Sequence, residues 1–200
     1  SPTQTLNQAA AAVKAEPGFD AFIEGSQVVD EAGEPLVVYH GNISKEKFSE
    51  FRTPAFFTND REYASRYVDG TADSDAVMSM YLSIKNPLTI DAATHELGDD
   101  AVELANDPDW VSSQIDAGHD GVIVKGSGDG IHTYIAFHPE QIKSIFAEKF
   151  DPASPNILEQ SAVPIQKKPL KITGTGNKGK ITNWDIADAF TKRHNEKYGR

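Results

Sequence analysis

Residues 36–42 read Leu-Val-Val-Tyr-His-Gly-Asn, and the rest of the chain is organised around this stretch. Its apolar and β-branched start is typical of a buried strand, which predicts that His40 and Gly41 lie where the strand leaves the sheet. A histidine in that place can hydrogen-bond a ligand from a rigid base, and a glycine lets ligand atoms reach the bare backbone. A histidine satisfied in the core and a simple turn glycine would give the same two letters, so the pattern needs support from elsewhere.

The composition describes a globular protein of ordinary size. Of its 200 residues, 38% are hydrophobic, which is enough to bury a core. The chain contains no cysteine, which excludes disulfides, thiolate metal sites and cysteine nucleophiles. We find no apolar run of about 18 residues and no secretory leader, so we expect a cytoplasmic protein without membrane contact.

The charge of the chain is unevenly distributed. Residues 151–200 hold nine Lys or Arg against five Asp or Glu, whereas the whole chain has a net charge of −11. Residues 1–150 therefore have a net charge near −15, and such a body repels phosphate backbones. This disfavours nucleic acid as a partner, although the basic tail leaves it open.

Aromatic residues mark a second candidate element. Residues 55–58 read Ala-Phe-Phe-Thr and predict a short strand, followed by a helix whose start is typical of a capping box from Asn59 to Glu62. Tyr63 and Tyr67 lie one turn apart on this helix. Together with the strand aromatics they could form a slot for a flat ring, or they could simply fill the core.

The chain divides into four segments by composition. We expect an N-terminal helical segment over residues 1–18, a main domain over 19–150, a linker rich in Pro, Gly and Lys over 151–180, and a C-terminal helix over 181–200. Short strands between interrupted helices favour an α+β fold over a doubly wound parallel sheet.

Other kinds of site find little support. The six histidines lack metal-ligand spacing, so no metal is expected. Residues 174–179 contain glycines and a lysine but lack the preceding strand of a phosphate-binding loop. No nucleophile elbow supports a serine hydrolase.

Five short sequence motifs, taken in order, resemble those of one family. They are VVDEAGEPLVVYHG at 28–41, FFT at 56–58, IKNPL at 84–88, DGVIVK at 120–125 and QIKS at 141–144. This order is similar to the ADP-ribosyltransferase domain of polyvalent proteins from phages and mobile elements. That domain belongs to the branch that includes diphtheria toxin and the poly(ADP-ribose) polymerases. The resemblance spans roughly residues 19–150 and implies two small packed, mainly antiparallel sheets with flanking helices.

The resemblance also implies that NAD is the substrate. His40 matches the family histidine that hydrogen-bonds a ribose of NAD, and Gly41 matches the glycine whose backbone binds the nicotinamide carboxamide. Tyr67 matches the aromatic residue that stacks on nicotinamide. Phe56 stands where many members have tyrosine, and it keeps the ring while losing a hydroxyl. The neighbouring aromatic residues Tyr39, Phe57 and Tyr63 complete the expected NAD-binding set.

The third family motif departs from the pattern. Counting back from Gln141, the glutamate position of the polymerases falls on Thr133, which cannot carry a negative charge near neutral pH. Asp129 and Glu140 are the nearby carboxylates that could replace it. His40, Tyr67 and Thr133 are thus the expected catalytic positions.

Three functions remain open at this point. The first is a mono-ADP-ribosyltransferase that acts on a host or phage protein, in the host cytoplasm if the protein is phage-encoded. The second is a catalytically weak or inactive module with the same fold, which binds a partner or nucleotide. The third is ADP-ribosylation of nucleic acid.

Overall fold

The computed structural model describes residues 2–42, 48–68, 76–98, 100–126 and 130–158. The strands in these ranges are β1 (Val38–Gly41), β2 (Ala55–Thr58), β3 (Val77–Leu82), β4 (Pro87–Asp91), β5 (Gly121–Lys125), β6 (His132–Ala136) and β7 (Ile142–Ser144). The α-helices are α1 (Pro2–Val13), α2 (Phe19–Ile23), α3 (Arg61–Ser65), α4 (Asp100–Leu104) and α5 (Pro108–Asp116), and a 3₁₀ turn, η1, spans Pro139–Gln141.

The described strands form one sheet in the order β4-β5-β6-β2-β1-β3-β7. Every pairing is antiparallel except β4 with β5, so the sheet is mixed. An α+β fold is confirmed by this arrangement, but one sheet stands in place of the two that were expected. The sheet has two halves, β4-β5-β6-β2 and β1-β3-β7. They are joined because β1 and β2 share a register pair, Tyr39 with Thr58.

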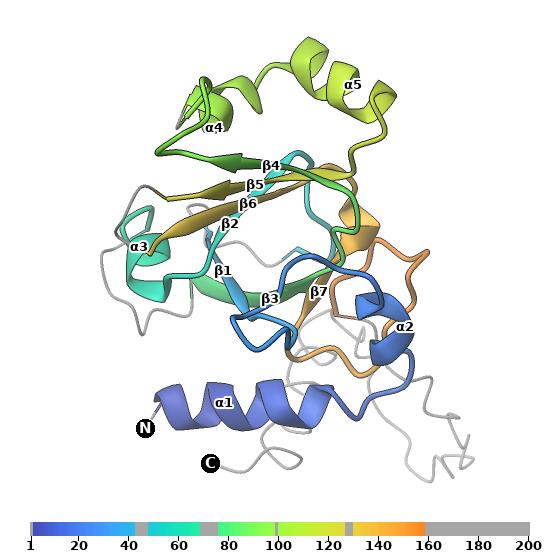
Figure 1. The fold of residues 1–200 in the computed structure, drawn as a ribbon. Coiled ribbons are helices and arrows are strands. Elements are labelled where there is room, and N and C mark those ends of the chain that lie inside the picture. Colours follow the sequence, from blue (N-terminus) through green and yellow to red (C-terminus); the bar gives the residue numbers. More distant parts are fainter. Residues whose placement is uncertain (1, 43–47, 69–75, 99, 127–129, 159–200) are drawn as a thin grey trace, which may run out of the picture. The chain divides into compact units, whose positions relative to one another are not determined.

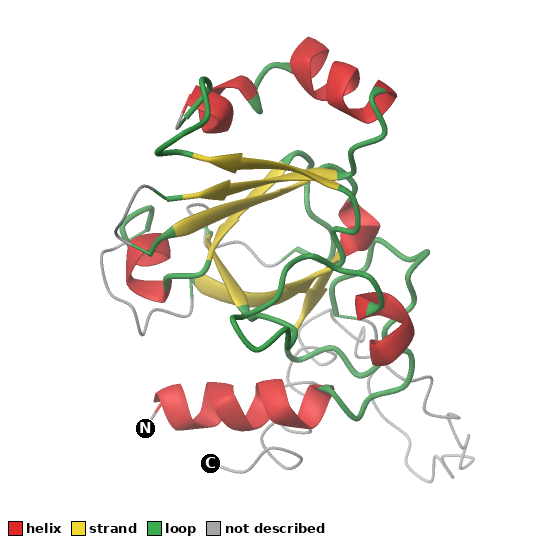
Figure 2. Ribbon diagram, viewed as in Figure 1, coloured by secondary structure: helices red, strands yellow, loops and turns green. Residues whose placement is uncertain are grey.

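The sheet separates three hydrophobic clusters, with helices on both sides of the strands (Figure 2). The first cluster is enclosed by the curled sheet and contains Val38, Phe57, Met80 and Tyr134. The second lies under α1 and α2, on the β3 side, and the third under α4 and α5, on the β4–β5–β6 side (Figure 1). The curled sheet therefore has an enclosed inner face and an outer face that helices cover in two places.

Two of the family motifs hold the scaffold together. The carboxylate of Asp120 accepts hydrogen bonds from the backbone N–H groups of Lys85 and Asn86, each at 2.8 Å. The side-chain amide of Gln141 donates to the carbonyls of Ser83 (3.1 Å) and Asp120 (2.9 Å). These bonds fasten the β3–β4 corner to the start of β5 and to η1, so both residues serve the fold.

Packing continues past Phe150. Ile157 is 0% exposed and belongs to the enclosed cluster. Lys143 is fully buried, and its Nζ donates to the carbonyls of Ser154 (2.7 Å) and Asn156 (2.9 Å). The segment expected to begin a linker at residue 151 therefore packs on the sheet up to Ile157. Residues 159–180 and the expected C-terminal helix lie outside the described residues.

A chain that ends at Phe150 is expected to melt well below one that ends at Leu158. The shorter chain loses Ile157 from the core, a change of about 2–5 kcal/mol for a buried aliphatic side chain. It also deprives the buried Lys143 ammonium of two carbonyl acceptors. Thermal unfolding followed by circular dichroism, with the full chain alongside, measures the difference. Equal melting temperatures for the two truncated chains would contradict the packing described for residues 151–158.

Candidate functional site

The site begins where β1 and β2 part. Tyr39 and Thr58 are register partners, and β2 offers Gly41 no register partner further along. On the other side of β1, the Asn42 N–H donates to the Ala76 carbonyl at 2.8 Å. Hydrogen-bonded pairs alternate along an antiparallel ladder, so the backbone N–H and C=O of Gly41 point away from β3 and toward the β2 side. They face the gap that opens between the two strands.

The imidazole of His40 bridges this gap. Its Nδ1 lies 2.8 Å from the carbonyl oxygen of Phe56, and since a carbonyl only accepts, Nδ1 carries the hydrogen. In the neutral ring Nε2 then has a free lone pair. Ring contacts with Phe51 (5.0 Å between centroids) and Phe57 (5.6 Å) hold the imidazole in place.

Burial keeps His40 neutral. Desolvation lowers the pKa of His40 below 6.5 and outweighs the hydrogen bond to Phe56, which raises it. At neutral pH the ring can therefore accept a hydrogen bond at Nε2 from a hydroxyl group, such as that of a ribose.

Gly41 lies against the end of α3. An added Cβ would be 2.5 Å from the Ala64 carbonyl oxygen and 3.1 Å from the Cβ of Tyr67. His40 and Gly41 are the last two residues of β1, at the strand end where the sequence analysis expected them. The glycine thus has a packing reason as well as an open backbone, and it brings Tyr67 directly beside that backbone.

The start of α3 differs from the expected capping box. Asp60 is the N-cap residue, and its carboxylate accepts from the Tyr63 N–H at 2.7 Å. The predicted cap from Asn59 to Glu62 is therefore wrong by one position. Aspartate and asparagine cap helices about equally well, so two adjacent residues of these types leave the choice to tertiary contacts.

Asn59 instead ties the β2–α3 corner to the strand that carries Thr133. Its side chain donates to the Gly130 carbonyl (2.9 Å) and accepts from the His132 N–H (2.8 Å). The Gly126 N–H donates to Nδ1 of His132 at 3.1 Å. Both described ends of the β5–β6 connection are thereby fastened close to the start of β6.

Tyr67 is the most exposed aromatic residue of this region, with 55% of its surface accessible. Its ring lies edge-on to that of Tyr63, with 5.7 Å between centroids, and its hydroxyl donates to that of Tyr63 at 3.2 Å. The donated hydrogen bond raises the pKa of Tyr67 above 10.

Thr133 lies in the row of β-sheet residues that contains Tyr39. It is the register partner of Thr58, which in turn pairs with Tyr39. Direct partners point to the same face of a sheet, so these three side chains share a face, and Gly41 and Phe56 share it one step along the strands. Thr133 is half-buried on β6.

Of the two expected substitute carboxylates, only Glu140 lies among the described residues. Glu140 lies in η1, beyond the far end of β6, and about 13 Å of strand separates residue 133 from residue 137. Glu140 therefore does not occupy the position of a third-motif glutamate. Asp129 lies outside the described residues.

The predicted residues gather around the junction of β1, β2 and α3, where Figure 1 shows α3 beside the two strands. Phe57 is buried in the core and supports His40 from behind. Tyr39 is half-buried, and the guanidinium of Arg61 lies 5.6 Å from its ring centroid. The sequence analysis missed Phe51 and Arg61, because only the fold brings residues of other segments onto His40 and Tyr39.

Residues 30–151 match the family of ADP-ribosyltransferases in polyvalent proteins. The chain belongs to this family. The match covers more than half of the chain and includes His40, Gly41, Tyr67 and Thr133. No curated protein and no solved structure matches the chain significantly. Members of the family take ADP-ribose from NAD, so the fold and the substrate class agree with the site built above.

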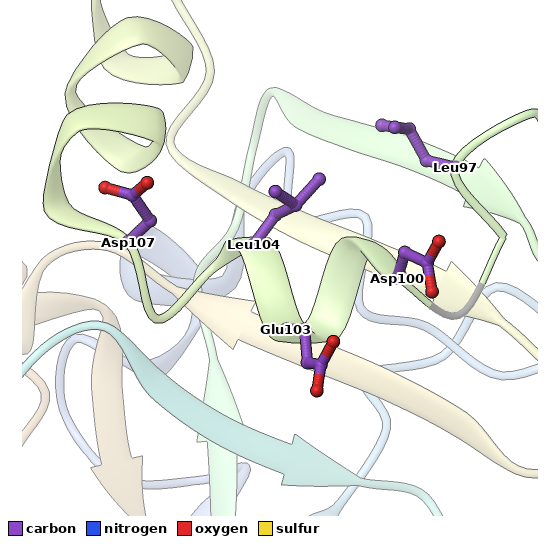
Figure 3. A pocket seen from close by; sticks show the side chains of 5 residues that line it. All are labelled: Leu97, Asp100, Glu103, Leu104 and Asp107. Carbon is purple, nitrogen blue, oxygen red and sulfur yellow. The ribbon is translucent and has the colours of Figure 1, made fainter.

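A hollow of about 510 Å³ lies beside α4. It is lined by Leu97, Asp100, Glu103, Leu104 and Asp107 (Figure 3). Its three carboxylates would repel the pyrophosphate of a dinucleotide. Within the described ranges no group of three or more His, Asp or Glu could hold a metal, and no helix could cross a membrane.

His40→Ala and Tyr67→Ala are each expected to weaken NAD binding at least about tenfold. The first change removes a hydrogen-bond acceptor and the second a stacking surface, each contributing roughly 1.4 kcal/mol or more. Titration calorimetry with NAD measures the effect, with His95→Ala on an exposed turn as the control. Unchanged affinity in both variants would show that the site is placed wrongly.

Because of His40, the free energy of unfolding is expected to decrease as the pH decreases. Its pKa is lowered in the folded state, so the unfolded chain binds the proton first as the pH drops through about 6.5. The penalty is absent well above that pH and complete below the folded-state pKa. Urea unfolding at several pH values should show the stability difference between wild type and His40→Gln shifting against wild type as the pH falls. A difference independent of pH would contradict the buried neutral imidazole.

Proposed function

We propose that this ADP-ribosyltransferase attaches single ADP-ribose units from NAD to a protein acceptor and releases nicotinamide. The observation that carries the proposal is the open backbone of Gly41, which follows His40 in β1 and packs against Tyr67. A carboxamide needs one donor and one acceptor side by side, and the Gly41 N–H and C=O supply both.

Each residue of the site has a role in this reaction. Gly41 holds the carboxamide, the rings of Tyr67 and Phe56 hold the nicotinamide plane, and Nε2 of His40 accepts a ribose hydroxyl. The C–N bond to nicotinamide then breaks, and its electron pair neutralises the pyridinium. Positive charge develops on the ribose, as in glycoside transfer. The acceptor forms the new bond at that carbon and loses a proton.

Thr133 supports single transfer. A threonine hydroxyl can hydrogen-bond a ribose, but it cannot act as a carboxylate base or stabilise the developing cation by charge. Chain growth requires a ribose hydroxyl of attached ADP-ribose to be activated as the nucleophile, whereas an acceptor side chain can bring its own reactivity. Orientation alone can supply a large part of the rate, so the missing carboxylate slows transfer without abolishing it.

Thr133 also favours a second candidate function, a module that binds NAD or a partner without transferring ADP-ribose. One experiment distinguishes transfer from binding alone. The protein is incubated with labelled NAD and cell lysate, and the product is then treated with protease or nuclease. Label released by protease supports transfer to a protein acceptor. Label released by nuclease would identify nucleic acid as the acceptor, which the acidic body disfavours. NAD binding without any labelled product would support the binding module.

Wild type is expected to form single ADP-ribose adducts, and Thr133→Glu is expected to raise NAD hydrolysis or transfer. The new carboxylate would restore the charge that the third motif lacks. A gel of products from labelled NAD compares wild type with Thr133→Glu and with the neutral control Thr133→Gln, which should show no gain. A ladder of polymer from wild type would contradict the proposal.

A further inference from the structure

The orientation of the Tyr67 ring has to be fixed by contacts outside the regular helix. The helix α3 ends at Ser65, so Tyr67 lies beyond the regular helix, with its N–H donating to the Ala64 carbonyl at 3.3 Å. More than half of its surface is exposed. An exposed side chain without fixed contacts samples several rotamers, and ordering it when a ligand binds costs affinity.

Tyr63 supplies two contacts to that ring. Its own ring meets Tyr67 at an angle of 67° with 5.7 Å between centroids, and its hydroxyl oxygen accepts the Tyr67 hydroxyl hydrogen at 3.2 Å. An edge contact leaves the faces of the Tyr67 ring available for stacking. The hydrogen bond at the far end of the ring limits its rotation, so the two contacts together define one orientation.

Arg66 in turn contacts Tyr63. Its guanidinium carbon lies 5.5 Å from the Tyr63 ring centroid, within the range of a cation–π contact. Tyr63 therefore lies in contact with Arg66 and with Tyr67, and the three residues come from a single turn and its continuation.

We propose that Tyr63, held by Arg66, is a positioning residue that fixes the Tyr67 ring for stacking on the nicotinamide of NAD. This inference rests on the function proposed above and deepens it. It assigns the Tyr63 hydroxyl an indirect role, through Tyr67, and gives Arg66 a role in NAD affinity without contact to NAD.

A double-mutant cycle on the two hydroxyls tests the proposal. Tyr63→Phe and Tyr67→Phe keep both rings and delete the same hydrogen bond from its two ends. Each is expected to raise the NAD dissociation constant about fivefold, measured by calorimetry. The double variant should be no weaker than either single variant, because the bond is already lost. Tyr81→Phe is the control: it deletes a hydroxyl that donates to the Ala10 carbonyl and should lower the melting temperature while leaving NAD affinity unchanged.

The role of Arg66 is tested in a second background. Arg66→Ala should weaken NAD binding about threefold in the wild-type chain and should have no further effect in Tyr63→Ala. A further loss in Tyr63→Ala would mean that Arg66 meets NAD directly and would overturn its indirect role.

The outcomes separate this proposal from the function on which it rests. Loss of affinity in Tyr67→Ala with unchanged affinity in both Phe variants would overturn the positioning role and leave the NAD site intact. Effects of the two Phe variants that multiply in the double variant would also overturn it. A wild-type chain that does not bind NAD would overturn both.

Discussion

The structure depends on the register pair Tyr39 with Thr58, at which β1 and β2 meet before they part. Pairing at this point joins the two halves of the sheet, so that the curled strands enclose a common core. Separation just beyond it leaves Phe56 and Gly41 with backbone groups directed at one another across a gap. The His40 imidazole occupies part of the gap and satisfies the Phe56 carbonyl. A buried polar backbone group left without a partner is costly, so the histidine serves the fold as well as the site.

Close approach of α3 to β1 is the second constraint. The position of Gly41 leaves no room for a Cβ against the Ala64 carbonyl, and this same approach brings Tyr67 beside the open backbone. One residue therefore satisfies two demands that have different physical origins, packing and ligand access. Substitution of this glycine would disturb both together, which makes it a poor residue for separating them. The hydroxyl pair of Tyr63 and Tyr67 is better suited, because it lies at the surface and leaves the backbone unchanged.

The family text contains residues of two kinds. Asp120, Gln141 and Lys143 lie in the most distinctive motifs, and they bind backbone groups of corners and of the C-terminal segment. His40 and Gly41, by contrast, lie at the gap, where His40 hydrogen-bonds the Phe56 carbonyl. Resemblance in the motifs is therefore stronger evidence for the fold than for catalysis. Thr133 shows the difference, because the fold matches the family there while the third-motif glutamate is absent.

Local sequence determined the short strands and the helix after residues 55–58, because apolar periodicity and turn residues act over a few positions. The order of the five motifs determined the family. The sequence also singled out Tyr63 and Tyr67, but not Phe51, whose ring contacts His40. It could not decide which of Asn59 and Asp60 caps α3, because both are good caps and the choice depends on the bonds of Asn59 to Gly130 and His132. Nor could it show that Ile157 belongs to the core, since two adjacent apolar residues, Ile157 and Leu158, after a proline-containing stretch give no periodicity. Tertiary structure alone decided these points, and it alone excluded Glu140, because strand register sets distances between residues that are close in sequence.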